Sequence, residues 1–265
     1  MSLTHPTSII SESAKIGKDV TIGPFCTIGP NVTIGNGCRL ISHVTIEGDT
    51  TIGENNTFFQ FTSIGFQPQD LKYSNEPSKV LIGDNNTFRE CVTVHRGTQS
   101  GLMLTKIGNN NLLMANCHVA HDCRIGDNNV FANSVALAGH VEIGNRCILG
   151  GLSAVHQFSR IGDFAMLSGG TMASKDIPPY CYAQGNHARL RGLNLVGLKR
   201  GGFSNEDISA IKSAYMLLFR NPGIFQEKIS IIEDKYSELE KIGFFINFLK
   251  TSKRGITRAG SEETE

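Results

Sequence analysis

The stretch TIGPFCTIGPNVTIGNGC, residues 21 to 38, repeats one motif of six residues three times. In each copy an isoleucine is followed by glycine, and a small residue stands four places after the isoleucine. The same period runs along most of the chain, as twenty-five hexads in runs of ten, three and twelve that begin at Ile10, Ile82 and Ile107. A period of six fits neither the 3.6 residues of a helical turn nor the alternation of a strand.

This period predicts a solenoid in which each hexad forms one flat side and points its aliphatic residue inward. Three sides complete a coil of about 18 residues, so residues about 18 apart should lie above one another. Some eight coils stacked at about 4.8 Å give a prism on the order of 40 Å long. The fold class is therefore mainly β, a parallel β-helix of hexapeptide repeats. The repeat is similar to that of the hexapeptide family, and this resemblance alone implies a left-handed β-helix.

Two polar segments interrupt the repeat. The first, GFQPQDLKYSNEPSKVL at 65–81, replaces two hexads and preserves the phase. The second, HRGTQSGLMLTK at 95–106, shifts the phase by one residue. Both are predicted to be loops expelled from the scaffold, and loops of this kind commonly carry binding residues.

A small α-helical cap should close the C-terminal end of the β-helix, where backbone groups would otherwise stay unpaired. Ser204 and Asp207 have the spacing of a helix start, and NPG at 221–223 ends that helix. A second helix is predicted at about 224–241 and a third near 244–250, while TRAGSEETE at 257–265 is predicted to be a frayed tail. The chain thus divides into a β-helix at 1–178, a connecting segment with substrate contacts at 179–203, and a helical domain at 204–265.

Composition and net charge exclude several classes of protein. With 265 residues, 40% hydrophobic and 18% charged, the chain can bury a sizeable core. Its net charge of +1 gives no field that would attract nucleic acid or a membrane. The N-terminus has no secretory pattern, and no window approaches the roughly 18 apolar residues of a membrane span. We therefore expect a cytoplasmic protein with no membrane span, no nucleic acid partner and seven reduced cysteines.

The segment HVAHDC at 118–123 has imidazole and thiol groups at a spacing that would suit zinc. The repeat removes the thiols from this interpretation, because the cysteine falls in the small inward position of its hexad. The same position predicts buried thiols at Cys26, Cys38, Cys117, Cys123 and Cys147. It also holds Asn56, Asn86, Asn111 and Asn129, which are expected to hydrogen-bond to neighbouring coils.

Four histidines should gather on one outer strip. His121, His140 and His156 follow one another at intervals close to the length of one coil, which places them on three successive coils, and His118 lies close to His121. A single zinc ion could not readily bind all three, since His121 and His156 would be roughly 10 Å apart at the backbone. No metal or other cofactor is therefore expected. His5 and His43 are expected to be solvated.

General-base chemistry suits this strip better than metal binding. A neutral imidazole accepts a proton near pH 7, and Asp122 beside His121 could stabilise the protonated ring. The sequence has no nucleophile elbow, because GLSAV lacks the second glycine of that motif. Direct transfer without a covalent enzyme intermediate is the simpler mechanism.

The whole chain resembles the UDP-N-acetylglucosamine acyltransferase family, which carries out the first step of lipid A biosynthesis. The matching segments are SHVTIEGDTTIG, QPQDLKY, VTVHRGT, HVAHDC, LAGHV, AVHQF, PPYCYAQGNHA and GLKRGGF. The resemblance implies transfer of a 3-hydroxyacyl group from acyl carrier protein to the 3-hydroxyl of UDP-N-acetylglucosamine. In that reaction His121 would be the general base, Asp122 would support it, and the backbone N–H of Gly139 would stabilise the oxyanion.

Further residue roles follow from the same resemblance. His118, His140, His156 and Gln157 would orient the substrate or the acyl chain. Asp70 and Lys72 in the first loop would bind the sugar nucleotide, and Asn194 and Arg200 would reach its uridine and phosphate groups. The resemblance also implies a homotrimer with sites in clefts between subunits.

Three positions modify what the resemblance implies about acyl-chain length and nucleotide contacts. Gly169 lies where the family uses a residue as the floor of the acyl groove, so a chain such as 3-hydroxymyristoyl is expected rather than a ten-carbon one. Val196 and Gly201 stand where relatives often carry glutamate and arginine, so nucleotide contacts there are expected to differ.

Other functions remain open on the sequence alone. One is acylation of a 3-amino sugar analogue, another is a zinc-dependent hydratase of the hexapeptide fold, and a third is a non-catalytic scaffold. Basic residues could attract the acidic carrier protein, namely Lys199, Arg200, Lys250, Lys253 and Arg254.

Overall fold

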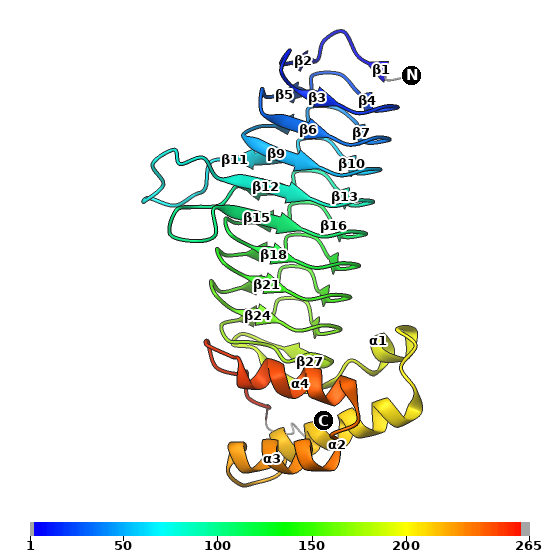
Figure 1. Ribbon diagram of the computed structural model, residues 1–265, viewed down its shortest axis with the longest axis vertical. Coiled ribbons are helices and arrows are strands. Elements are labelled where there is room, and N and C mark those ends of the chain that lie inside the picture. The colour runs from blue at the N-terminus through cyan, green and yellow to red at the C-terminus, as the bar shows by residue number, and fades with distance from the viewer. Residues whose placement is uncertain (1–2, 261–265) are drawn as a thin grey trace.

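The computed structural model describes residues 3–260 and shows a three-sided prism of stacked coils with helices at one end (Figure 1). Each side is a sheet of parallel strands in which a strand pairs with the strand three places along the chain, because every coil contributes one strand to each side. The exceptions are at the C-terminal end of one sheet, where β25 (Met166–Leu167) pairs with β27 (Cys181–Gln184) and β27 pairs antiparallel with β28 (Arg189–Leu193). This is the left-handed parallel β-helix with a C-terminal helical cap that the sequence predicts, and the predicted fold class is confirmed.

The three sides are named here the first, second and third face. The first face contains β1 (Leu3–Thr4), β4 (Thr21–Ile22), β7 (Arg39–Leu40), β10 (Thr57–Phe58), β13 (Thr87–Phe88), β16 (Leu112–Leu113), β19 (Val130–Phe131), β22 (Ile148–Leu149), β25 (Met166–Leu167), β27 (Cys181–Gln184) and β28 (Arg189–Leu193). The second contains β2 (Ile9–Ile10), β5 (Thr27–Ile28), β8 (Thr45–Ile46), β11 (Ser63–Phe66), β14 (Thr93–His95), β17 (His118–Val119), β20 (Ala136–Leu137), β23 (Ala154–Val155) and β26 (Met172–Ala173). The third contains β3 (Lys15–Ile16), β6 (Val32–Ile34), β9 (Asp49–Ile52), β12 (Lys79–Ile82), β15 (Leu104–Ile107), β18 (Arg124–Ile125), β21 (Glu142–Ile143) and β24 (Arg160–Ile161).

Strand register confirms the predicted coil. Arg39 pairs with Thr57, and Leu112 pairs with Val130, so one lap has the length of three hexads. The two inserted segments lengthen their laps, but the strands on either side of each loop stay in the ladders. Both loops project from the same side of the prism, one between β11 and β12 and the other between β14 and β15 (Figure 1).

The interior is filled as the hexads predict. The recurring aliphatic residues from Ile22 onward are buried, and Phe58 stacks on Phe88 with ring centroids 4.8 Å apart. The five cysteines predicted to face inward are buried, which confirms that prediction. His5 and His43 are exposed, as expected for solvated residues.

The buried asparagines form a ladder along the axis, as predicted. The Asn56 side-chain oxygen accepts hydrogen bonds from the Asn86 backbone and side chain at 2.9 and 3.0 Å. Asn86 accepts the same pair from Asn111, and Asn129 continues the ladder through its own backbone N–H. Hydrogen bonds between coils therefore compensate the burial of these asparagines, although the amide nitrogen of Asn129 has no partner among the described residues.

The helical cap consists of α1 (Leu195–Arg200), α2 (Asn205–Phe219), α3 (Phe225–Lys235) and α4 (Glu240–Lys250). The predicted start at Ser204 is confirmed, because Ser204 and Asp207 form a reciprocal capping box. None of the described helices is long and apolar enough to cross a membrane.

Three details of the C-terminal prediction are wrong. The short helix α1 was not expected, since so short a segment gives little periodic signal. The second helix ends at Lys235 rather than near 241, and the third begins at Glu240 rather than near 244, because the chain reverses at 236–239 so that Tyr236 and Leu239 pack on the core.

The predicted tail is also ordered where the structure describes it. Thr257 is buried, and isolated bridges join Ile256 to Asp176 and Ala259 to Leu190. Backbone pairing of this kind holds the end of the chain against the last coils. The rest of the predicted tail, 261–265, lies outside the described residues. The division into units 1–178, 179–203 and 204–265 stays a prediction.

Candidate active site

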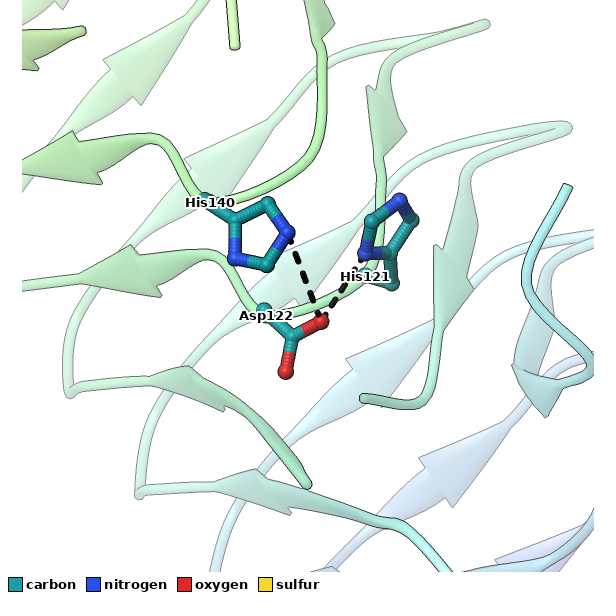
Figure 2. A group of neighbouring side chains, drawn as sticks. All are labelled: His121, Asp122 and His140. Atoms are coloured by element: carbon teal, nitrogen blue, oxygen red, sulfur yellow. Dashed lines mark hydrogen bonds and ion pairs between the residues drawn. The ribbon is translucent and has the colours of Figure 1, made fainter. Parts of the chain in front are cut away.

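The candidate site lies at the corner where the second face turns into the third. His121 occupies the first position of this corner, and Gly139 and Gln157 occupy the same position on the next two coils. The second position is held by Asp122, His140 and Phe158, whose φ angles are 59°, 61° and 63°. This left-handed conformation turns the chain sharply, so each side chain at the second position is aimed across the corner. His121 and His140 therefore converge although they lie on successive coils (Figure 2).

Asp122 is the buried centre of the group. Its carboxylate accepts hydrogen bonds from His121 Nδ1 at 2.9 Å, Thr98 Oγ1 at 2.6 Å and the Leu102 backbone N–H at 2.9 Å. Burial opposes ionisation and would raise the pKa of Asp122, but the hydrogen bonds from His121, Thr98 and Leu102 outweigh it and lower this pKa to about 2. The carboxylate is therefore ionised at neutral pH, and it anchors the second inserted loop to the corner.

This contact sets the tautomer of His121. An ionised carboxylate can only accept, so Nδ1 of His121 carries the proton that it donates to Asp122. The other ring nitrogen, Nε2, is then free to accept a proton. A Cβ placed on Gly139 would lie 2.5 Å from Cε1 and 2.6 Å from Nε2 of His121, so the Nε2 edge of the ring lies directly against the Gly139 backbone.

His140 covers this pair from the next coil. Its Nε2 is 4.0 Å from Asp122 Oδ2, and its ring meets that of His121 edge-on at 5.0 Å between centroids. The opposite face of His140 stacks on Phe158 at 4.4 Å. Burial lowers the pKa of His140, against the opposing effect of Asp122 and Asp70, so the ring is neutral at pH 7.

A cleft of about 610 Å³ runs along the second face beside this corner. Its walls include two alanines on β20 and β23, the backbone of Gly139, and a set of imidazoles. The imidazoles that line it are His95, His118, His121, His156 and His187. An apolar floor with a few converging polar groups is typical of a small-molecule site.

Comparison with known proteins identifies the family. Residues 176–257 match the second domain of UDP-N-acetylglucosamine O-acyltransferase, and residues 13–48 and 104–139 match the bacterial transferase hexapeptide repeat. The chain is 48% identical over 258 residues to the acyl-[acyl-carrier-protein]--UDP-N-acetylglucosamine O-acyltransferase of Myxococcus xanthus, covering 97% of this chain and all of that one. The chain belongs to the UDP-N-acetylglucosamine O-acyltransferase family.

Solved structures of this family superpose along the whole acyltransferase chain. The enzyme from Moraxella catarrhalis is 46% identical with a TM-score of 0.93, covering 96% of this chain and 99% of that one. The enzyme from Francisella novicida is 40% identical with a TM-score of 0.94, covering 99% and 100%. The resemblance inferred from the sequence motifs is confirmed.

The structure brings together most of the residues that the sequence predicts for the acyltransferase site. Those around the corner and cleft are His118, His121, Asp122, Gly139, His140, His156 and Gln157. A hydrogen bond of 2.7 Å joins His118 Nδ1 and Thr93 Oγ1. At the far end of the cleft, the exposed Arg254 guanidinium donates to His156 Nδ1 at 3.0 Å.

Asp70 and Lys72 lie in the first inserted loop, next to the corner but outside the cleft wall. Asp70 raises the pKa of His140 through space, against burial, so its carboxylate is near that ring. Arg96 and Glu76 tie the two inserted loops together, through Tyr73 Oη at 2.8 Å and the Gln99 backbone N–H at 2.9 Å respectively. Loop 65–81 is thus held close to the acyltransferase cleft.

Three predicted residues are not at this cleft within one chain. Gly169 lies at the corner between the first and second faces, where a Cβ would meet only the Gly151 carbonyl oxygen at 3.4 Å. Asn194 and Arg200 line a separate hollow of about 430 Å³ on the first face. The exposed Val196 lines the same hollow.

Asn194 already has structural partners in this chain. Its side-chain oxygen caps helix α1 by accepting from the Gly197 N–H, and its amide nitrogen donates to the Phe164 carbonyl at 2.9 Å. Gly201, which ends that helix, packs so close to Phe164 that a Cβ would lie 2.4 Å from the ring. The glycine therefore fits this packing.

Sequence reasoning missed His95 as a site residue. His95 is buried, its ring lies edge-on to His118 at 5.0 Å, and its buried Nδ1 has no hydrogen-bond partner among the described residues. Burial, with smaller effects of His118 and His121, lowers the pKa of His95 to about 4. His95 lies where the phase of the hexads shifts, so the length of a coil did not predict its place. Pairing of Val94 with Val119 places His95 beside the histidine strip.

Proposed function

We propose that this protein transfers a 3-hydroxyacyl chain from acyl carrier protein to the 3-hydroxyl of UDP-N-acetylglucosamine, the first step of lipid A biosynthesis, in the cytoplasm. The observation that carries this proposal is the His121 ring, whose free Nε2 edge lies in the cleft while buried Asp122 holds its other nitrogen. The name of the Myxococcus xanthus relative supports the choice of donor and acceptor.

The proposed mechanism is direct. Nε2 of His121 takes the proton of the sugar hydroxyl while its oxygen attacks the thioester carbonyl, which forms a tetrahedral oxyanion. The oxyanion then collapses, the carbon–sulfur bond breaks, and the departing carrier thiolate takes the proton from His121. The positive charge that His121 carries between these steps is stabilised by the Asp122 carboxylate. No cofactor takes part in this sequence.

The backbone N–H of Gly139 is the proposed oxyanion donor. No described residue accepts a hydrogen bond from it, and it lies beside the ring that would bear the proton. A preorganised donor of this kind is commonly worth about 10²- to 10³-fold in rate. His118, His140, His156 and Gln157 are proposed to orient the acceptor or the acyl chain.

We expect Gly139→Ala to lower kcat by about 10²-fold or more. The added methyl group would lie 2.5 Å from the His121 ring and must push it out of line with the hydroxyl. The fold should persist, because the backbone here is compatible with alanine. Steady-state kinetics measures the effect, with Gly192→Ala as the control, since a Cβ there meets nothing within 4 Å. Wild-type kcat in Gly139→Ala would contradict the proposed contact.

A homotrimer is proposed to complete the site, with Asp70, Lys72, Asn194 and Arg200 binding the sugar nucleotide. Asn194 and Arg200 sit on a different face from His121, so a second subunit is needed to bring them to the same cleft. The corner that holds Gly169 also exposes Phe25, Phe61 and Leu152, with 56%, 60% and 69% of their surface accessible. Exposed apolar side chains at this corner support burial against another subunit. Light scattering coupled to gel filtration tests the subunit number.

Gly169 is proposed to leave the acyl groove long. We expect wild-type protein to prefer a 14-carbon over a 10-carbon 3-hydroxyacyl donor, and Gly169→Met to reverse this preference by about 10- to 100-fold in the ratio of kcat/KM. A methionine side chain at position 169 would fill the space that the distal methylene groups of the acyl chain occupy. Gly243→Met, on the open surface of α4, is the control. An unchanged length preference in Gly169→Met would remove this residue from the groove.

Acyl carrier protein is proposed to dock near Lys253 and Arg254. Lys250 is already paired with Glu233, whereas Lys253 is exposed and Arg254 reaches the cleft at His156. We expect Lys253→Glu to raise KM for the carrier roughly threefold at low salt and less at high salt. The matched control is Lys18→Glu on an early coil, which should leave KM unchanged. Equal KM values for the two variants would place the docking surface elsewhere.

The experiment that tests the proposed function is a substrate panel with mass detection of product. Purified protein is offered 3-hydroxyacyl carrier thioesters of several lengths with UDP-N-acetylglucosamine or its 3-amino analogue. We expect ester formation on the 3-hydroxyl sugar. Amide formation on the amino analogue alone would favour the alternative acceptor, and no product from any pair would leave the scaffold alternative. A zinc-dependent hydratase would instead need metal for turnover.

A further inference from the structure

The side chains around Asp122 also have the geometry of a metal-binding site. A ring nitrogen of His121, a carboxylate oxygen of Asp122 and a ring nitrogen of His140 all lie within 4.8 Å of one another, and Figure 2 shows the three side chains converging. His121 Nδ1 is 2.9 Å from Asp122 Oδ2, and His140 Nε2 is 4.0 Å from the same oxygen. Two imidazoles and one carboxylate are among the ligand sets that zinc uses in proteins. The zinc sites considered from the sequence were the HVAHDC segment and the set of His121, His140 and His156, and neither is this trio.

We propose that His121, Asp122 and His140 form an inhibitory zinc site that competes with proton transfer. Tetrahedral zinc with bonds of about 2.0 to 2.1 Å places its ligand atoms roughly 3.3 Å apart. The His121–Asp122 separation of 2.9 Å is already close to this value, and His140 Nε2, at 4.0 Å, must move about 1 Å closer to the Asp122 oxygen. Among residues 3–260 the His140 ring contacts Phe158 by stacking and His121 edge-on, and neither contact fixes it by a hydrogen bond, so the ring can slide along the Phe158 face toward the carboxylate.

Charge and access favour a divalent cation at this place. The ionised Asp122 carries one negative charge, and the neutral ring of His140 adds no opposing positive charge. The side chains of His121 and His140 are each 15% accessible, so an ion can reach them from solvent. Three protein ligands leave the fourth zinc position for a water molecule.

Zinc at Nδ1 would disable His121 as a base. The metal takes the electron pair of Nδ1, so the ring proton leaves that nitrogen, and the neutral ring then carries its proton on Nε2. An Nε2–H group has no lone pair with which to accept the sugar proton. This inhibitory effect rests on the proposed function, whereas zinc binding itself does not.

Equilibrium dialysis against zinc chloride, followed by metal analysis, tests the binding. The protein carries Cys91→Ser, because Cys91 is the exposed thiol among the seven cysteines and could bind zinc by itself. We expect one zinc per chain, and at least about tenfold weaker binding in His140→Asn. Asparagine tolerates the left-handed backbone at this position, so the variant should fold. His156→Gln removes a nearby exposed histidine outside the trio and should bind zinc as before.

A second measurement needs no variant of the trio. Cobalt(II) added to the same protein should give the visible absorption of a four-coordinate nitrogen and oxygen site, and zinc should displace it. Zinc should also slow acyl transfer over the concentration range in which it binds, with recovery after a chelator is added. Absence of bound zinc, equal affinity in His140→Asn, or full transfer activity with zinc bound would each overturn the proposal. If no acyl transfer is found with any substrate, dialysis and cobalt spectra still decide the binding.

Discussion

His121→Ala is expected to lower kcat for acyl transfer by about 10²- to 10⁴-fold. The hydroxyl oxygen of the sugar is a weak nucleophile until its proton is removed, and within the cleft the Nε2 edge of His121 is the group oriented by a buried carboxylate. Loss of the ring leaves Gly139 and the substrate contacts in place. KM for either substrate should therefore change much less than kcat.

The control for this variant is His5→Ala, which removes an exposed histidine on the first coil. It should transfer acyl chains at the wild-type rate. Circular dichroism and thermal melting should show that His121→Ala keeps the β-helix, since its side chain contributes no core packing. Turnover above about one tenth of wild type in a folded His121→Ala protein would mean that another group takes the proton.

The hexad pattern was enough to predict the three-sided β-helix, apart from its handedness, and the grouping of His121 with His140. Once three hexads make one lap, His140 falls one lap and one step after His121 at the same corner, and the left-handed backbone turns it back toward Asp122. The inward cysteines and the asparagine ladder followed from the same periodicity. These predictions succeeded because each depends on register alone, which the core fixes strictly.

The contacts that complete the site depend on something other than register. Thr98 and Leu102 reach Asp122 from a loop whose path no repeat specifies. His95 starts that loop at the phase break, and its burial beside His118 does not follow from the hexad period. Asn194 and Gly169 lie on other surfaces of the prism, so their proposed roles depend on how subunits meet.

Asp122→Asn is the second variant with a large expected effect, a fall in kcat of about 10²- to 10⁴-fold. The carboxylate accepts from three sources at once, His121 Nδ1, Thr98 and the Leu102 N–H, and an amide has only one oxygen. If the amide nitrogen faces His121, the ring adopts the tautomer with its proton on Nε2 and no longer accepts one. If the amide nitrogen faces the second inserted loop, it meets two backbone N–H donors of that loop. Donor groups repel one another, so residues 96–103 should become less tightly held.

Asp127→Asn is a matched control for this change. Asp127 stands in a column at another corner whose neighbours on adjacent coils are Asn109 and Asn145, so the column accepts either residue. Kinetics and thermal melting of Asp127→Asn should both resemble wild type. Equal kcat values for the two variants would show that the Asp122 charge has no part in the reaction.

Stability against acid gives Asp122→Asn a second and independent signature. The pKa of Asp122 is about 2 in the folded protein and close to 3.8 when unfolded, so ionised Asp122 stabilises the fold above about pH 4. This contribution, about 2 kcal/mol, is lost as the pH falls from about 4 to about 2. The variant should therefore unfold more easily than wild type at pH 7, and the gap in denaturant midpoint should narrow toward pH 2. A gap that stays constant with pH would mean that the amide only disturbs packing, because the charge would then contribute nothing to the folded state.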